Sequence, residues 1–202
     1  VDLNAPSEDA LDALIEEGER AGVFPLARAC VLVRGRQVWE GGNTPASTAF
    51  DLASVTKVMA TTAIALRLKV ELGAPLGRFL PAARAATATL EDLLFHRSGL
   101  PPFVPFFGPV MAQLPQLFDA ACPPRLRAEA RARVVEQVLA AAPTRAVGEA
   151  AVYSDLGFIL LGEALAAAAG SPLDELFLRL VAQPLGLSAT YRRISTPSPL
   201  PA

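Results

Sequence analysis

Hydrophobic positions near the start of the chain follow first a helical and then a strand-like spacing. Over residues 7–21 the apolar side chains fall on one helical face behind Ser7, a favourable N-cap, so this segment predicts an amphipathic helix. Two short apolar runs, residues 28–34 and 37–40, predict strands joined by a turn near Gly35. We find no convincing pattern for a third strand, and a lone two-stranded hairpin is only marginally stable.

Helical spacing dominates the rest of the chain, where Pro- and Gly-rich loops separate the apolar segments. Residues 126–142 and 155–169 predict two helices, and Gly170 marks the end of the second one. Between Lys57 and Arg67 there is no charged residue, which predicts a helix that is buried on all sides. Two further helix starts are indicated by capping residues, Thr89 and Ser171.

Composition agrees with a helix-rich globular protein and excludes two classes of partner. Hydrophobic residues make up 52% and charged residues 19% of the 202 residues. The net charge of −2 provides no basic field for nucleic acid. Uncharged, Pro-free apolar runs stay shorter than the ~18 residues that a membrane-spanning helix needs. We therefore expect no nucleic-acid partner and no membrane span.

Histidine and cysteine are too scarce for a zinc site or a disulfide framework. The chain has a single histidine, His96, and two cysteines, Cys30 and Cys122. Cys30 lies in a strand-like apolar run and is predicted to be a buried thiol, whereas Cys122 precedes two prolines in a loop. We predict no metal and no cofactor.

The pair Ser54 and Lys57 is the first candidate for chemistry. The chain has two lysines against sixteen arginines, yet a lysine lies one helical turn after this serine. Residues three apart share a helix face, so the amine is expected beside the hydroxyl. A buried amine can lose its proton and activate a serine, whereas an arginine guanidinium keeps its proton. The alternative is a helix cap followed by a solvent-reaching lysine.

Five segments in order resemble the serine β-lactamase and penicillin-binding-protein superfamily, most closely its class C β-lactamase, DD-peptidase and esterase branch. They extend over roughly residues 10–190 and read TAFDLASVTKVMAT, LGRFLP, TLEDLLFHRSGLPP, YSDLGFILLGEALAAAAGSPLDELF and QPLGLSAT. The resemblance implies an α+β fold in which an antiparallel sheet flanked by helices adjoins an all-helical lobe. On this basis we expect the sheet lobe with the nucleophile helix over residues 1–70, the helical lobe over 71–190 and an irregular tail over 191–202.

The resemblance also implies an acyl-enzyme mechanism with a known set of residues. Ser54 matches the nucleophile, Lys57 its activating partner, and Tyr153 the tyrosine of the Tyr-x-Asn element. Which of Lys57 and Tyr153 is the base stays open. Asp155 occupies the asparagine position, where a carboxylate can bind substrate only as an acceptor, pair with Lys57, or act as a helix N-cap. The family's third element, Lys-Thr-Gly or His-x-Gly on a sheet strand, has no match in this chain.

We therefore predict a serine hydrolase that acts on an ester or amide: a β-lactam, a D-alanyl peptide or a short-chain ester. The sheet strands without a match here are expected from a longer polypeptide or from a second chain. The alternative is a non-catalytic module of the same fold that binds partners. His96 is expected to serve the structure of a helix end, and Phe103, Phe106 and Phe107 to pack in the core or line an acyl pocket. A bacterial source is expected, and the compartment is left open.

Overall fold

The computed structural model describes residues 7–119 and 121–191, which divide into two compact units. The first unit extends to Asp51 and the second begins at Leu52. The three-part division expected from the sequence, with boundaries after residues 70 and 190, stays a prediction. Apart from Tyr191, the expected tail over 191–202 lies outside the described residues.

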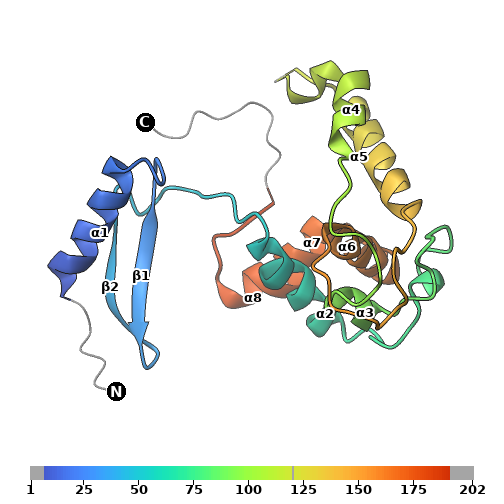
Figure 1. Ribbon diagram of the computed structural model, residues 1–202, viewed down its shortest axis with the longest axis horizontal. Helices are drawn as coiled ribbons and strands as arrows, with labels where there is room; N and C mark the ends of the chain where they lie inside the picture. The colour runs from blue at the N-terminus through green and yellow to red at the C-terminus, as the bar shows by residue number, and fades with distance from the viewer. Residues whose placement is uncertain (1–6, 120, 192–202) are drawn as a thin grey trace. The chain divides into compact units, whose positions relative to one another are not determined.

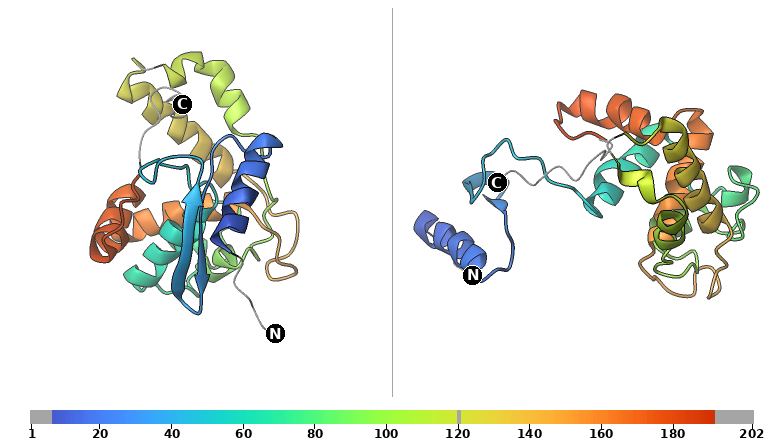
Figure 2. Two further views of the ribbon diagram at one scale, coloured as in Figure 1. Left: turned by 90° about the vertical axis from the view of Figure 1, so that its left-hand side faces the viewer. Right: turned by 90° about the horizontal axis from the view of Figure 1, so that it is seen from above.

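The first unit contains one helix and one hairpin (Figure 2). Helix α1 (Glu8–Arg20) begins as predicted, because the Ser7 hydroxyl accepts a hydrogen bond from the Ala10 N–H at 3.3 Å. Strands β1 (Arg28–Val33) and β2 (Arg36–Gly42) pair antiparallel, which confirms the predicted hairpin.

The turn and the packing of the hairpin follow from a few residues. Arg34 and Gly35 have φ values of +50° and +76°, as a tight two-residue turn between twisted strands requires. Helix α1 packs against β2, where the indole N–H of Trp39 donates to Asp12 Oδ1 at 3.2 Å. The prediction that Cys30 is buried was wrong, since its thiol is exposed.

The second unit is helical. Its elements are the π-helical segments η1 (Lys57–Thr62) and η4 (Leu178–Ala182), the 3₁₀ turns η2 (Leu76–Arg78) and η3 (Pro115–Phe118), and the α-helices α2 (Ala63–Leu68), α3 (Leu90–Leu94), α4 (Phe107–Gln113), α5 (Pro124–Leu139), α6 (Asp155–Ala169), α7 (Leu173–Phe177) and α8 (Gln183–Leu185). Figure 1 shows α6 in the middle of this unit, with α4 and α5 forming an arm beside it.

Helix α6 is the core element of the second unit. Eight of its fifteen residues are buried, and it packs against η1, α2, α3, α5 and α7. It begins at Asp155 and ends with Gly170 in the left-handed conformation, φ +62°, which confirms the predicted helix and its end. Leu156, Leu160, Leu161 and Leu165 are fully enclosed. The buried residues extend from Leu156 to Leu165, so the core fixes the position of the first turns of this helix.

The predicted helix starts are partly confirmed. At α3, Asp92 N–H donates to the Thr89 hydroxyl at 3.1 Å and Thr89 N–H donates to Asp92 at 3.0 Å, so the capping box is present. The prediction for Ser171 was wrong. Helix α7 begins at Leu173 after Pro172 as its cap, and the Ser171 hydroxyl instead donates to Glu175 at 3.0 Å. Ser171 lies one residue too early to cap this helix.

The prediction that the helix after Lys57 is buried all round was also wrong. Ala60 and Ile64 are buried, but Val58 and Leu66 are 69% and 63% exposed. Within the second unit, η1 and α2 contact α6, α7 and η4, and Val58 and Leu66 lie outside these contacts.

Phe103, Phe106 and Phe107 were expected either to pack in the core or to line an acyl pocket. Their ring centroids lie 5.9–6.4 Å apart in one cluster. Phe106 packs against the main core, whereas Phe103 and Phe107 are about half exposed. Phe107 lines a cavity of about 250 Å³ with residues of α4 and α5, including Val110 and Val134. An acyl pocket formed by these rings stays a prediction.

Within the described residues, no single helix is long and apolar enough to cross a membrane. The helices of Asp155–Ala169 and Leu173–Leu185 together meet the criteria of length and composition, but only as a pair bent by 78°. Much of α6 is buried in the unit, as expected of a core helix.

Truncating α6 tests its central place in the second unit. We expect Leu161→Ala to lower the free energy of unfolding by about 2–5 kcal/mol, because the lost methyl groups leave a cavity in an enclosed core. Leu66→Ala makes the same chemical change at an exposed position and should stay within about 0.5 kcal/mol of the unchanged chain. Denaturant titration followed by circular dichroism measures both, and equal losses would contradict this description of the core.

Candidate active site

Ser54 lies in the turn that leads into η1. Lys57 N–H donates to the Ser54 carbonyl at 3.0 Å and Thr56 N–H to the Ala53 carbonyl at 3.1 Å, so tight turns precede the helix. Ala53 has a φ of +42°, in the left-handed region that non-glycine residues seldom adopt. Such backbone strain, and π-helical turns like η1, are frequent at functional sites. The Ser54 side chain is exposed at this turn.

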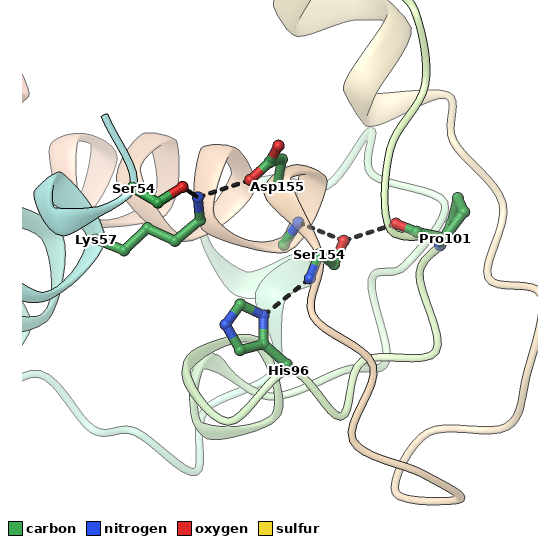
Figure 3. Close-up of polar contacts among 7 residues, drawn as sticks. Ser54, Lys57, His96, Pro101, Ser154 and Asp155 are labelled. Carbon is green, nitrogen blue, oxygen red and sulfur yellow. Dashed lines mark hydrogen bonds and ion pairs between the residues drawn. The ribbon is translucent and has the colours of Figure 1, made fainter. Parts of the chain in front are cut away.

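The Lys57 amine connects the nucleophile candidate to helix α6 (Figure 3). Its Nζ donates to Ser54 Oγ at 3.1 Å and to Asp155 Oδ1 at 2.6 Å. The three-residue spacing thus brings the serine and lysine together as predicted, and the fold adds a carboxylate from 98 positions further along. The Lys57 side chain is 15% exposed, so the amine is largely shielded from water.

Partial burial alone would lower the pKa of Lys57, because desolvation disfavours the ammonium form. Hydrogen bonding to Asp155 and to Tyr153 outweighs this effect, and the pKa of Lys57 is raised above its ordinary value. The amine is therefore a cation throughout the neutral range. The carboxylate that raises this pKa occupies a position where the resemblance predicts an amide.

Tyr153 completes the cluster. Its side chain is 52% exposed, and the Lys57 Nζ lies 4.8 Å from the ring centroid. Polar contact first with Lys57 and then with the Ser54 hydroxyl lowers the pKa of the Tyr153 phenol. Both contacts favour the phenolate, one as a neighbouring cation and the other as a hydrogen-bond donor. Four side chains from two distant parts of the chain thus meet at one place.

Asp155 is the first residue of α6 and not its N-cap, so the N-cap interpretation was wrong. The cap is Ser154, whose hydroxyl accepts from Gly157 N–H at 3.2 Å and donates to the Pro101 carbonyl at 2.7 Å. The Asp155 N–H donates to the Pro102 carbonyl at 3.0 Å. Because Ser154 takes over the capping, the Asp155 carboxylate is available for Lys57.

The loop after α3 holds the segment that carries Tyr153. The His96 carbonyl accepts from Val152 N–H at 2.8 Å. Figure 3 shows the second contact, in which His96 Nδ1 accepts from Ser154 N–H at 3.0 Å. His96 therefore lies at the edge of the site, where its hydrogen bonds go to the segment that bears Tyr153. Its φ of +57° shows the left-handed turn that ends α3, in agreement with the expected structural use.

The sequence alone did not identify Ser154 or His96 as parts of the site. Serine followed by aspartate fits a helix start in two registers, since both residues are good caps and an acidic first turn is also favourable. His96 and Ser154 are 58 positions apart, so no local spacing indicates their contact. That His96 is the single histidine was the one available signal.

The described residues contain no group of three or more His, Cys, Asp and Glu side chains that could hold a metal ion. A hydroxyl, an ammonium, a phenol and a carboxylate in contact are groups that can transfer protons and, through the hydroxyl, attack a carbonyl carbon.

Comparison with known proteins identifies solved structures of the same fold. A class C beta lactamase from Rhodobacter sphaeroides superposes with a TM-score of 0.63 at 23% identity, over 90% of this chain and 50% of that one. A D-stereospecific amidohydrolase from Streptomyces gives 0.66 at 23% identity, over 91% and 56% of the two chains. These neighbours confirm the predicted α+β, β-lactamase-like fold.

Sequence comparison gives the same relationship. The D-alanyl-D-alanine-carboxypeptidase/endopeptidase AmpH of Escherichia coli K12 is 33% identical over 157 residues, which cover 73% of this chain and 37% of that protein. The chain thus spans well under two thirds of the length of these relatives. The family model described as Beta-lactamase matches residues 11–199. The chain therefore belongs to the Beta-lactamase family of serine hydrolases.

Proposed function

We propose that this protein hydrolyses an ester or amide through an acyl-enzyme on Ser54. The observation that carries the proposal is the position of one ammonium, Lys57 Nζ, at 3.1 Å from Ser54 Oγ and 2.6 Å from the Asp155 carboxylate, with Tyr153 beside it. Membership of a family that acts on amides and esters supports the same reaction class.

We assign the base to Tyr153 and an electrostatic role to Lys57. A lysine must be neutral to accept the Ser54 proton, and Asp155 raises the pKa of Lys57 and so favours the cation. The same cation lowers the pKa of the Tyr153 phenol, which favours the phenolate that can accept a proton. The sequence leaves open whether Lys57 or Tyr153 is the base. We choose Tyr153 because Asp155 favours the protonated form of Lys57.

The reaction then proceeds in two proton-balanced halves. Tyr153 phenolate takes the Ser54 hydroxyl proton while Oγ attacks the substrate carbonyl carbon, and the leaving amine or alkoxide takes that proton from Tyr153 as its bond breaks. In the second half, water gives a proton to Tyr153 and attacks the acyl carbon, and Ser54 Oγ recovers the proton on departure. Lys57 stabilises the phenolate and the attacking oxygen throughout.

Amides adjacent to a D-alanine are the first substrates to test. The name of the Escherichia coli relative, D-alanyl-D-alanine-carboxypeptidase/endopeptidase, and that of the D-stereospecific amidohydrolase from Streptomyces support this choice. β-Lactams and short-chain esters remain the other two classes that the same residues can process.

Covalent labelling tests the nucleophile. Incubation with a fluorophosphonate or a labelled penicillin should add one probe mass per chain, and peptide mapping should locate it on Ser54. Ser54→Ala should abolish the adduct, whereas Ser47→Ala, a change of the same type outside the site, should leave it intact. A folded protein that acquires no adduct at Ser54 under either reagent would instead support the non-catalytic binding module.

Substitution of Lys57 separates a base from a fixed charge. If Lys57 acts only as a cation, Lys57→Arg should acylate faster than Lys57→Met, whose rate should fall by about 10²–10³. Arginine cannot lose its proton, so equal losses in both variants would instead identify Lys57 as the base. Stopped-flow acylation with a chromogenic ester measures the rates.

The pH profile of the same reaction provides an independent check. The acylation rate should rise with pH as Tyr153 ionises, with the rise below the ordinary phenol pKa of about 10. In Lys57→Met the cation that lowers the pKa of Tyr153 is gone, so the rise should move to higher pH. An unchanged profile would show that Tyr153 is not the base under the control of Lys57.

A further inference from the structure

His96 holds the chain on both sides of Tyr153. Its carbonyl accepts from Val152 N–H at 2.8 Å, and its ring Nδ1 accepts from Ser154 N–H at 3.0 Å. The residue between these two anchored amides is Tyr153. His96 therefore fixes the backbone from which the Tyr153 side chain extends toward Ser54.

The imidazole ring, whose Nδ1 accepts from Ser154 N–H, also packs against two other rings. Its centroid lies 4.6 Å from that of Tyr153 and 4.9 Å from that of Phe158, with both ring pairs tilted by 36°. The Lys57 Nζ lies 4.8 Å from the Tyr153 ring centroid. The Tyr153 ring thus has contacts with the imidazole and with the ammonium, and both limit its rotation.

The hydrogen bond to Ser154 also fixes the protonation state of His96. A ring nitrogen that accepts from a backbone N–H carries no proton, so the neutral form must carry its proton on Nε2. When the imidazole takes up a second proton, Nδ1 becomes a donor facing a donor, and the bond to Ser154 is lost.

We propose that His96 is a positioning residue of this active site: its neutral ring holds Tyr153 beside Lys57, and protonation of Nδ1 releases Tyr153. The positioning of Tyr153 by His96 follows from the two hydrogen bonds and the ring contact described above. Its consequence for catalysis rests on the proposed function of Ser54 and Tyr153.

The charges around His96 favour the neutral form. Burial first, and then the Lys57 cation, lower its pKa, while Asp155 acts in the opposite direction and more weakly. The charged groups nearest in its own segment are Glu91, Asp92 and Arg97, of which Arg97 pairs with both carboxylates at 3.7 Å. With a lowered pKa, the contribution of His96 to stability is complete above the ordinary imidazole value of about 6.5 and is lost as the pH falls through the folded value.

Two variants separate the acceptor from the rest of the residue. Asparagine tolerates the left-handed backbone at this position, and its amide can accept from Ser154 N–H without titrating. Glycine also adopts φ +57° without strain but provides no acceptor and no ring. Both variants therefore tolerate the left-handed backbone at position 96. They differ in whether the side chain can accept the hydrogen bond from Ser154 N–H.

The single histidine and the two tyrosines make nuclear magnetic resonance a direct readout, because His96 is assigned without ambiguity and Tyr191 serves as the control for Tyr153. We expect the Nε2–H tautomer at neutral pH. On acidification, the Tyr153 ring signals should shift with the same midpoint as His96, while those of Tyr191 do not. His96→Asn should lose the acid step and shift the Tyr153 signals at neutral pH only by the effect of the missing ring, whereas His96→Gly should displace them further at every pH.

This readout needs no activity, so its failure is distinct from failure of the proposed function. A Tyr153 signal that ignores the His96 titration, or that is as displaced in His96→Asn as in His96→Gly, overturns the positioning role. Phosphonylation of Ser54 by a fluorophosphonate, with loss of fluoride, is the second arm: below the His96 midpoint the wild-type rate should fall at least about tenfold further than the His96→Asn rate, since only the wild type loses the acceptor. Identical profiles also overturn the role, whereas no phosphonylation in any form contradicts the function of Ser54 alone.

Discussion

The burial of helix α6 is the constraint on which the candidate site depends. Eight of its residues are enclosed by the second unit, so the helix has one position, and its first turn is fixed with it. Ser154 caps that turn by accepting from Gly157 N–H and donating to Pro101. The Asp155 carboxylate is thereby presented to Lys57 at 2.6 Å, although 98 positions separate the two residues. A core made of leucines thus positions the carboxylate that raises the pKa of Lys57.

Asp155 reverses the expectation that the sequence raised for Lys57. A partly buried amine without a partner loses its proton more easily, which is the property that made lysine attractive as a base. The carboxylate removes this advantage, because the hydrogen bond from Lys57 raises the pKa of the amine. In the proposed mechanism lysine is still preferable to arginine, but for a different reason: its compact ammonium contacts Ser54 and Asp155 at once.

Local patterns predicted much of the fold, and interactions between distant residues account for most of what they missed. The cap at Ser7, the hairpin turn, the capping box at Thr89 and the end of α6 at Gly170 are each encoded within a few residues, and all are confirmed. The exposure of Cys30 depends on which elements cover it, which no local pattern contains. Within the site, the Ser54–Lys57 contact follows from helical spacing, whereas the contacts of His96 and Asp155 required the tertiary fold.

One positive charge links the properties of the whole cluster. The Lys57 ammonium lowers the pKa of the Tyr153 phenol and contributes to the lowered pKa of His96, while Asp155 raises the pKa of Lys57 itself. A neutral His96 is the form that accepts from Ser154 N–H and so anchors the segment that bears Tyr153. The same Lys57 cation therefore has two effects that act together. It favours the Tyr153 phenolate, and it favours the neutral His96 that holds the Tyr153 segment. A histidine fits this position better than an asparagine because the imidazole combines the acceptor with a flat ring against Tyr153 and Phe158.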